Sequence, residues 1–387
     1  MDGIGSDRID LSGKEGSGID GKGSREIPIF RTLEALRKWR NDARIRGLKV
    51  GCIPTMGALH EGHLNLIKTS LSRHPLTVMT LFVNPMQFAP SEDLLSYPRT
   101  FESDLNLLQT LLHTSQSHTT TTDTFPGPDY PKTTPTSSQS LGADAGDIKE
   151  SPLVIFAPTN DVMYPLRGEL QDLRRYKGVT VDMKGWGDVM EGVSRPQFFT
   201  GVATICTKLF NAVEPDHAYF GQKDIQQALL LRVLLTDLLV SHPSPHNLHI
   251  LPTTRDPIDH LALSSRNTYL TPPERAVAPV LYQALTAASK LWDTGTDISG
   301  EDIISTATSV IADEQRRISI NEQGVELRHD YIEVFDPETF EPIRGSVNVW
   351  KQKRRDMGQS TGAVIAGAVW VGRTRLIDNL LLGWEVD

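Results

Sequence analysis

The sequence has few cysteines, no long apolar run and no excess of basic residues, and each absence excludes a class of protein. Cys52 and Cys206 are too few for a disulfide framework, so the reducing cytosol is the expected compartment. No apolar run reaches the roughly 18 residues of a membrane-spanning helix. Lys and Arg number 39 against 48 Asp and Glu, a net charge of −9, which argues against broad nucleic-acid binding. A local basic cluster around one phosphate stays compatible with this balance.

Two polar segments contain few large apolar residues. Residues 1–26 are rich in glycine, serine and charge, and they lack the apolar core of a signal peptide. Residues 114–150 are rich in threonine, serine and proline. Because neither segment can bury enough surface to offset its ordering entropy, we predict a disordered tail at 1–26 and a disordered surface insertion at 114–150.

Outside the two polar segments, the chain up to residue 252 alternates apolar runs typical of strands with the periodic pattern of helices. Apolar runs that predict strands lie at 48–55, 76–83, 153–157, 217–220 and 247–252. Helical periodicity is found at 63–72, 101–112, 199–212 and 224–239. Strands that alternate with helices predict an α/β fold with a parallel sheet. We therefore expect a first domain over 27–252.

After residue 252 the order of elements changes. Helix patterns at 273–292 and 300–317 are followed by strand patterns at 328–335, 363–371 and 374–382. Helices followed by strands predict a smaller α+β domain, which we place at 253–387.

Residues 54–63, PTMGALHEGH, leave one predicted strand and open a helix. Ligands bind beyond the carboxyl ends of parallel strands, and a helix N-terminus there suits a phosphate. Gly57 and Gly62 allow the backbone to approach a ligand closely. His60 and His63 share a face of the first helical turn and can donate hydrogen bonds to phosphoryl oxygens as charge develops. A H-x-x-H pattern alone is often incidental, but in this setting we interpret it as a nucleotide site.

Three further motifs place polar side chains beside predicted strands. Asn84 and Gln87 in FVNPMQF (82–88) are amides able to bond hydroxyl or carboxylate groups. Lys223 in FGQKD (220–224) is a point charge suited to a phosphate. Asp224 can cap a helix or bind a ribose hydroxyl. The loop LALSSRN (261–267) offers two hydroxyls and a guanidinium, which together can clamp a triphosphate.

Residues 54–63 resemble the H-x-G-H signature of the nucleotidylyltransferase superfamily, and the motifs together resemble the pantothenate synthetase (pantoate–β-alanine ligase) family. The resemblance implies a Rossmann-like first domain and a small C-terminal domain that closes over ATP. The implied reaction condenses pantoate with β-alanine through a pantoyl adenylate and yields pantothenate, AMP and pyrophosphate, for coenzyme A synthesis. It also implies Mg²⁺ as cofactor, a cytoplasmic homodimer, and no nucleic-acid or membrane partner.

By this resemblance the catalytic residues are His60, His63, Lys223 and Arg266, with His63 as the proton donor. The residues expected to bind ATP are Met56, Gly57, Ala58, Leu59, His60, Glu61, Gly62, His63, Gly221, Gln222, Lys223, Asp224, Thr254, Leu263, Ser264, Ser265 and Arg266. Those expected to bind pantoate or β-alanine are Asn84, Gln87, Arg195 and Gln227. No metal ligand is assigned, and Asp104 is a candidate.

The chain departs from the family pattern at three positions. Gln222 stands where the family has glutamate, Phe198 where many members have histidine, and His260 where glycine is usual. Two alternatives stay open: another adenylyl- or cytidylyltransferase of the superfamily, or a non-catalytic descendant that acts as a binding protein. The first would not need Asn84, Gln87 and Gln227 together. The second should have lost a residue such as His63, Lys223 or Arg266.

Overall fold

The computed structural model describes residues 26–92, 94–117, 151–166, 168–292, 294, 296–320 and 324–387. The predicted tail, apart from residue 26, lies outside the described residues, and so do residues 118–150 of the predicted insertion. Residues 114–117 belong to a helix, α3 (Phe101–Ser117), so the prediction of disorder is wrong for that stretch.

A parallel sheet of six strands forms the larger part of the molecule, in the order β1-β4-β3-β2-β5-β6. The strands are β1 (Ile29–Phe30), β2 (Val50–Thr55), β3 (Leu76–Leu81), β4 (Leu153–Phe156), β5 (His217–Gly221) and β6 (Leu248–Leu251). Their near-continuous apolar sequences fit strands that are covered on both faces. The predicted α/β class is confirmed.

Helices cover this sheet on both faces. They are α1 (Leu33–Ile45), α2 (Glu61–Arg73), α3, α4 (Asn160–Met163), α5 (Glu191–Ser194), α6 (Phe198–Val213) and α7 (Ile225–Asp237). One apolar cluster joins the sheet to α1, α6 and α7, and another joins it to α2 and α3. Short 3-10 turns lie at Pro85–Gln87 (η1) and Gln222–Asp224 (η3), where β3 and β5 end.

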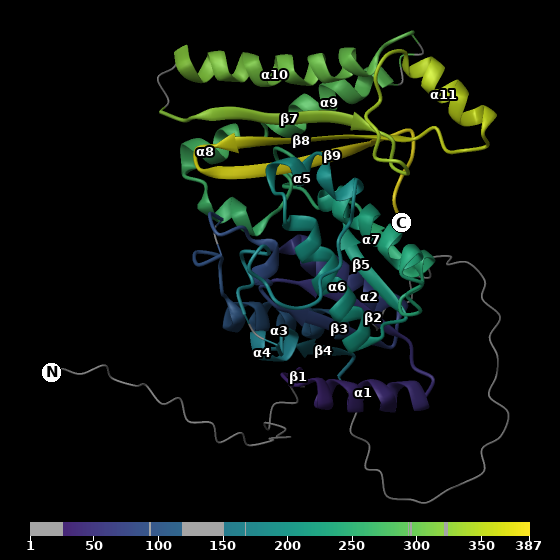
Figure 1. The fold of residues 1–387 in the computed structure, drawn as a ribbon. Helices are drawn as coiled ribbons and strands as arrows, with labels where there is room; N and C mark the ends of the chain where they lie inside the picture. The colour runs from purple at the N-terminus through teal and green to yellow at the C-terminus, as the bar shows by residue number, and fades with distance from the viewer. Residues whose placement is uncertain are drawn as a thin grey trace, which may run out of the picture.

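A second, antiparallel sheet of three strands lies beyond the carboxyl ends of the first (Figure 1). Its order is β7 (Leu327–Phe335), β8 (Ala363–Val371) and β9 (Thr374–Leu382). The accompanying helices are α8 (Pro272–Val277), α9 (Val280–Trp292), α10 (Gly300–Ile320) and α11 (Val347–Asp356). The predicted helix over 273–292 is thus two helices, broken at 278–279, where Pro279 lacks an amide hydrogen.

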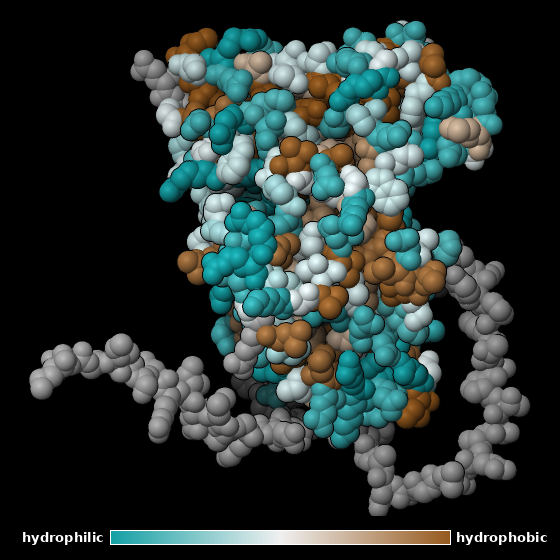
Figure 2. Space-filling view, in the orientation of Figure 1, coloured by the Kyte–Doolittle hydropathy of each residue, from teal (hydrophilic) through white to brown (hydrophobic). Residues whose placement is uncertain are grey.

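The described surface carries hydrophobic side chains in small groups. On the face shown in Figure 2 these groups are separated by hydrophilic residues. No described helix is both long enough and apolar enough to cross a bilayer.

Candidate active site

A cavity of about 1360 Å³ lies between the carboxyl ends of the larger sheet and the smaller sheet. Polar groups from β2, β3, β5 and β6 meet there, as expected for an open parallel sheet. The sequence-predicted site residues that line it are Met56, His60, Gly62, His63, Asn84, Gln87, Arg195, Gly221, Lys223, Asp224, Gln227, Thr254, Leu263, Ser264, Ser265 and Arg266. Five others do not: Gly57, Ala58, Leu59, Glu61 and Gln222.

His60 and His63 lie side by side at the start of α2, with ring centroids 4.1 Å apart. His60 caps the helix, because its Nδ1 accepts a hydrogen bond from the backbone N–H of Gly62 at 3.2 Å. In the neutral ring this leaves Nε2–H as a donor. The Nδ1 atom of His63 is buried without a hydrogen-bond partner among the described residues. Both rings line the cavity, and His60 can offer its Nε2–H to a ligand there.

Burial keeps both imidazoles neutral. It lowers the pKa of His60 to about 4, with a further contribution from the charge of Lys223. It lowers the pKa of His63 to about 3, helped by the neighbouring His60 and Lys223. At neutral pH the two rings act as hydrogen-bonding groups without charge, and Lys223 supplies the positive charge nearby.

Asp104 holds the turn that precedes these histidines. Its carboxylate accepts hydrogen bonds from the backbone N–H groups of Ala58 (3.0 Å) and Leu59 (2.8 Å). The turn needs this support because Ala58 has a φ of +51°, in the left-handed region that a residue with a Cβ rarely adopts. Gly57, at φ +84°, is a position where glycine is favoured. The carboxylate of Asp104, the candidate metal ligand, is thus already hydrogen-bonded to the backbone.

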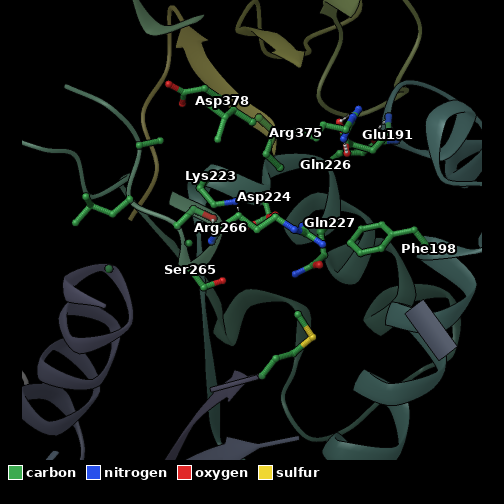
Figure 3. A pocket seen from close by; sticks show the side chains of 18 of the residues that line it. Glu191, Phe198, Lys223, Asp224, Gln226, Gln227, Ser265, Arg266, Arg375 and Asp378 are labelled. Carbon is green, nitrogen blue, oxygen red and sulfur yellow. Dashed lines mark hydrogen bonds and ion pairs between the residues drawn. The ribbon is translucent and has the colours of Figure 1, made fainter. Parts of the chain in front are cut away.

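Lys223 projects into the cavity from the turn after β5, close to Arg266 and Asp224 (Figure 3). Its Nζ lies 3.1 Å from the carboxylate of Asp224. Gln222, just before it, points away and is bound by Asn379 of β9 through its side-chain amide at 3.1 Å. The Asn379 amide also donates to the carbonyls of Gln222 and Lys223. The smaller sheet therefore fixes the backbone that carries Lys223.

The serine loop closes the cavity from another side. Ser264 caps the turn Ser265–Tyr269, and Ser265 lies 3.3 Å from the hydroxyl of Tyr97. The hydroxyl of Thr254 accepts a hydrogen bond from Asn65 of α2 at 3.0 Å. His260 has a φ of +63°, in the left-handed region that favours glycine.

The far end of the cavity holds the predicted pantoate residues. The side chain of Gln227 points toward it, near Phe198 (Figure 3). Arg195 is paired with Glu92 at 2.5 Å and lies over the ring of Phe198, 4.0 Å from its centroid. The phenylalanine found in place of histidine thus gives Arg195 an aromatic surface. Asn84, 1% exposed, has its amide bonded within the protein.

A model of the pantoate-beta-alanine ligase family matches residues 28–381. The chain belongs to this family. It is 35% identical over 357 residues to the pantothenate synthetase of Moorella thermoacetica, covering 92% of this chain and 99% of the relative. It is 35% identical over 370 residues to the pantoate–β-alanine ligase of Saccharomyces cerevisiae, covering 92% and 100%.

Solved structures of the family have the same fold. The pantothenate synthetase of Thermus thermophilus aligns with a TM-score of 0.65 at 32% identity, over 92% of this chain and 99% of that one. The Francisella tularensis ligase, described as complexed with β-γ ATP and β-alanine, aligns with a TM-score of 0.59 at 25% identity, over 92% and 97%.

Several residues of the ligase site escaped the sequence analysis. Glu191 of α5 accepts hydrogen bonds from Arg375 of β9 (2.6 Å) and from Tyr331 of β7 (2.9 Å), at the cavity wall (Figure 3). Tyr164 reaches Asn84 from behind the cavity. These partners lie 80 to 184 residues apart. No local spacing in the sequence could have paired them.

Proposed function

We propose that this ligase activates pantoate with ATP in the described cavity and then joins the pantoyl group to β-alanine. The observation that carries the proposal is the convergence of His60, His63, Lys223 and Arg266 on one cavity, in a chain that matches the ligase family over most of its length. Four groups able to donate to phosphate oxygens face the same space. Uncharged amides occupy its other end.

In the first step a pantoate carboxylate oxygen attacks the α-phosphorus of ATP, and the bond to the pyrophosphate oxygen breaks. Lys223 and Arg266 offset the negative charge of the phosphates, while the neutral imidazoles of His60 and His63 donate hydrogen bonds to them. We assign to His63 the role of a hydrogen-bond donor to the developing charge: with its pKa lowered to about 3, the neutral ring offers an N–H and keeps its proton. Catalysis here rests on positioning and on dipoles placed in advance.

In the second step the β-alanine amine attacks the carbonyl of the pantoyl adenylate. The C–N bond forms, the bond to the AMP oxygen breaks, and the amine loses a proton. No side-chain nucleophile is required. Cys52 and Cys206 are buried, and burial raises the pKa of both thiols, which fits their place in the core.

We also propose that ATP enters with Mg²⁺. The described residues contain no group of three or more His, Cys, Asp or Glu side chains that could hold a metal. This donor set fits an ion bound mainly by phosphate oxygens and water, as Mg²⁺ usually is. Asp224 at the cavity wall is the carboxylate that would contribute to it, whereas Asp104, the candidate from the sequence, does not line the cavity and is bonded to the turn. When bound, the ion neutralises phosphate charge.

The family resemblance further supports a cytoplasmic homodimer, with pantoate, β-alanine and ATP as its small-molecule partners. Sedimentation equilibrium would test the assembly: a species of one chain's mass across micromolar concentrations would contradict the dimer.

The function is tested by pyrophosphate release from ATP and Mg²⁺ with pantoate, in the presence and absence of β-alanine. We expect one pantoate-dependent equivalent without β-alanine and continuous turnover with it. ATP binding without pantoate-dependent release would favour a sibling transferase or a binding protein.

His63→Ala should lower the rate of pyrophosphate release at least about 100-fold, the range seen when one preorganised donor is removed. Ser72→Ala is a useful comparison, because Ser72 is exposed on the same helix and does not line the cavity. Far-ultraviolet circular dichroism should be unchanged. A near-normal rate for His63→Ala would exclude the hydrogen-bond-donor role.

A further inference from the structure

Tyr164 is buried directly behind the amide end of the cavity. It follows α4, is 2% exposed and does not line the cavity. Its hydroxyl donates to the side-chain oxygen of Asn84 at 2.5 Å. Burial raises the pKa of Tyr164, so the hydroxyl keeps its proton and remains a donor.

Two backbone groups fix which way the Asn84 amide faces. Its Oδ1 accepts from the backbone N–H of Met86 at 3.4 Å, and its Nδ2 donates to the carbonyl of Gly201 at 3.1 Å. A backbone N–H can only donate and a carbonyl can only accept, so the amide has one allowed orientation. The Tyr164 hydroxyl strengthens the same orientation at Oδ1.

Asn84 in turn fixes the orientation of Gln87. The second N–H of the Asn84 amide donates to the Oε1 atom of Gln87 at 3.1 Å. The Nε2 of Gln87 therefore lies on the other side, 3.2 Å from the sulfur of Met56, at the cavity wall. A thioether is a weak acceptor that occupies at most one of its two N–H bonds. The other has no partner among the described residues.

We propose that Tyr164 and Asn84 are positioning residues that make Gln87 a pure hydrogen-bond donor toward the substrate, so that this subsite selects an oxygen acceptor. Within the proposed function, on which this inference rests, the acceptor is an oxygen of pantoate. Asn84 itself has all four hydrogen-bonding positions engaged in the protein. In this proposal Asn84 therefore orients Gln87 and does not make the direct contact with substrate that the sequence had led us to expect.

The first test is Tyr164→Phe, assayed by pantoate-dependent pyrophosphate release. Asn84 loses its shortest hydrogen bond, so the Gln87 amide is held less firmly. We expect the KM for pantoate to rise roughly 3- to 10-fold, the range for one net hydrogen bond, with kcat and the KM for ATP within twofold of wild type. Tyr176→Phe is the matched control. Tyr176 packs on the same core, and no described residue is hydrogen-bonded to its hydroxyl.

A double-mutant cycle separates positioning from a general structural effect. If Tyr164 acts through Gln87, then adding Tyr164→Phe to a Gln87→Ala variant should change the KM for pantoate less than twofold. The proposal would be overturned if Tyr164→Phe raised the KM for pantoate equally in the wild-type and the Gln87→Ala enzyme, or if it lowered the affinity for ATP.

Gln87→Glu tests the donor polarity directly and does not disturb Tyr164. The ionised carboxylate of this variant would accept from Asn84 but could donate nothing to the ligand. We expect pantoate binding to fall at least 10-fold at pH 8 and to recover as the carboxyl group protonates toward pH 5. Wild-type affinity for pantoate at pH 8 would overturn the inference. Wild-type enzyme without pantoate-dependent pyrophosphate release would instead remove the proposed function, and the inference with it.

Discussion

The side chain of Asp104 shows how one buried residue supports a binding turn without lining the cavity. It is 2% exposed, and its carboxylate accepts hydrogen bonds from two backbone N–H groups of a turn that contains residues with left-handed φ angles. Asp104→Asn would place an amide NH₂ against one of these donors. We expect the free energy of unfolding to fall by about 1–3 kcal/mol, the penalty for an unsatisfied buried group, and the KM for ATP to rise.

Glu102→Gln is the control for this variant, because Glu102 is exposed on the first turn of the same helix. Urea denaturation and ATP kinetics should both be close to wild type for it. Equal effects of the two substitutions would show that the loss of acidic charge at the helix start matters, and not the bonds to Ala58 and Leu59.

Histidines outside the active site give the fold a dependence on pH. The rings of His74, His217 and His249 stack in a row, with centroids 4.2 and 5.3 Å apart. Desolvation lowers all three pKa values, that of His74 to about 4, against the opposing charges of Asp216 and Asp387. Below pH about 6.5 these histidines become protonated in the unfolded chain but stay neutral in the folded chain. The free energy of unfolding should therefore fall between pH 6.5 and 4.

Urea unfolding at pH 7.5 and pH 5 measures this loss. His74→Gln should reduce the difference between the two pH values, because one histidine with a lowered pKa is removed. His246→Gln should not, since His246 is exposed. A stability that is the same at both pH values in the wild-type chain would contradict the expectation.

At this scale the sequence identified the groups that face the cavity but not those that hold them. His60, His63 and Lys223 lie within short motifs whose spacing reflects local strand–turn–helix geometry. Tyr164 and Glu191 act on residues 80 and 184 positions away. Such pairings depend on how strands are ordered in space, which local periodicity does not encode.

Helix α6 and the turn η1 are in close contact near the site. A Cβ added at Gly201 would lie 2.6 Å from the Cα and N atoms of Gln87. Gly201→Ala should therefore push η1 away and disturb the Gln87 amide. We expect the KM for pantoate to rise at least tenfold and stability to fall by about 1–3 kcal/mol, as in overpacked cores.

Gly221→Ala is the comparison, because a Cβ at Gly221 meets nothing within 4 Å. Kinetics with varied pantoate and thermal unfolding would check both variants. Unchanged pantoate kinetics in Gly201→Ala would mean that η1 can shift without loss of binding.

Strands β2 to β6 of the larger sheet followed closely from the sequence, while the two-residue strand β1 and several helices did not. Helix α1 was missed although its buried apolar residues, Leu36, Trp39 and Ala43, recur at the three- and four-residue spacing of an amphipathic helix. α11 was missed because only Val347 and Arg354 are buried in it. Buried strands consist of continuous apolar runs, whereas a helix on the surface contributes only one narrow face to the core.

The smaller sheet is joined to helix α5 by an ion pair at the cavity wall. Arg375 of β9 is bonded to Glu191 of α5 and, within the smaller sheet, to Asp330 of β7, and the three side chains are 13%, 10% and 23% exposed. Removal of one partner leaves a buried charge unpaired. Glu191→Ala should therefore lower the free energy of unfolding by about 3–5 kcal/mol in urea denaturation.

Arg317→Ala is the control at this scale. It breaks an exposed pair with Glu314 within one helix, which should contribute at most about 1 kcal/mol. If both variants lost the same free energy of unfolding, the contact between α5 and the smaller sheet would contribute no more than a surface pair. Retained stability in Glu191→Ala would show that this pair is not needed to hold the fold together.

The bonds between Gln222 and Asn379 span 157 residues, and this has a consequence for synthesis on the ribosome. At about 5–20 residues per second, translation reaches Asn379 roughly 8–30 s after Gln222. During that interval the backbone of Lys223 lacks the side chain that fixes it. A nascent chain that has assembled the larger sheet therefore still lacks the Asn379 contact, and the wall around Lys223 is completed only when β9 has been made.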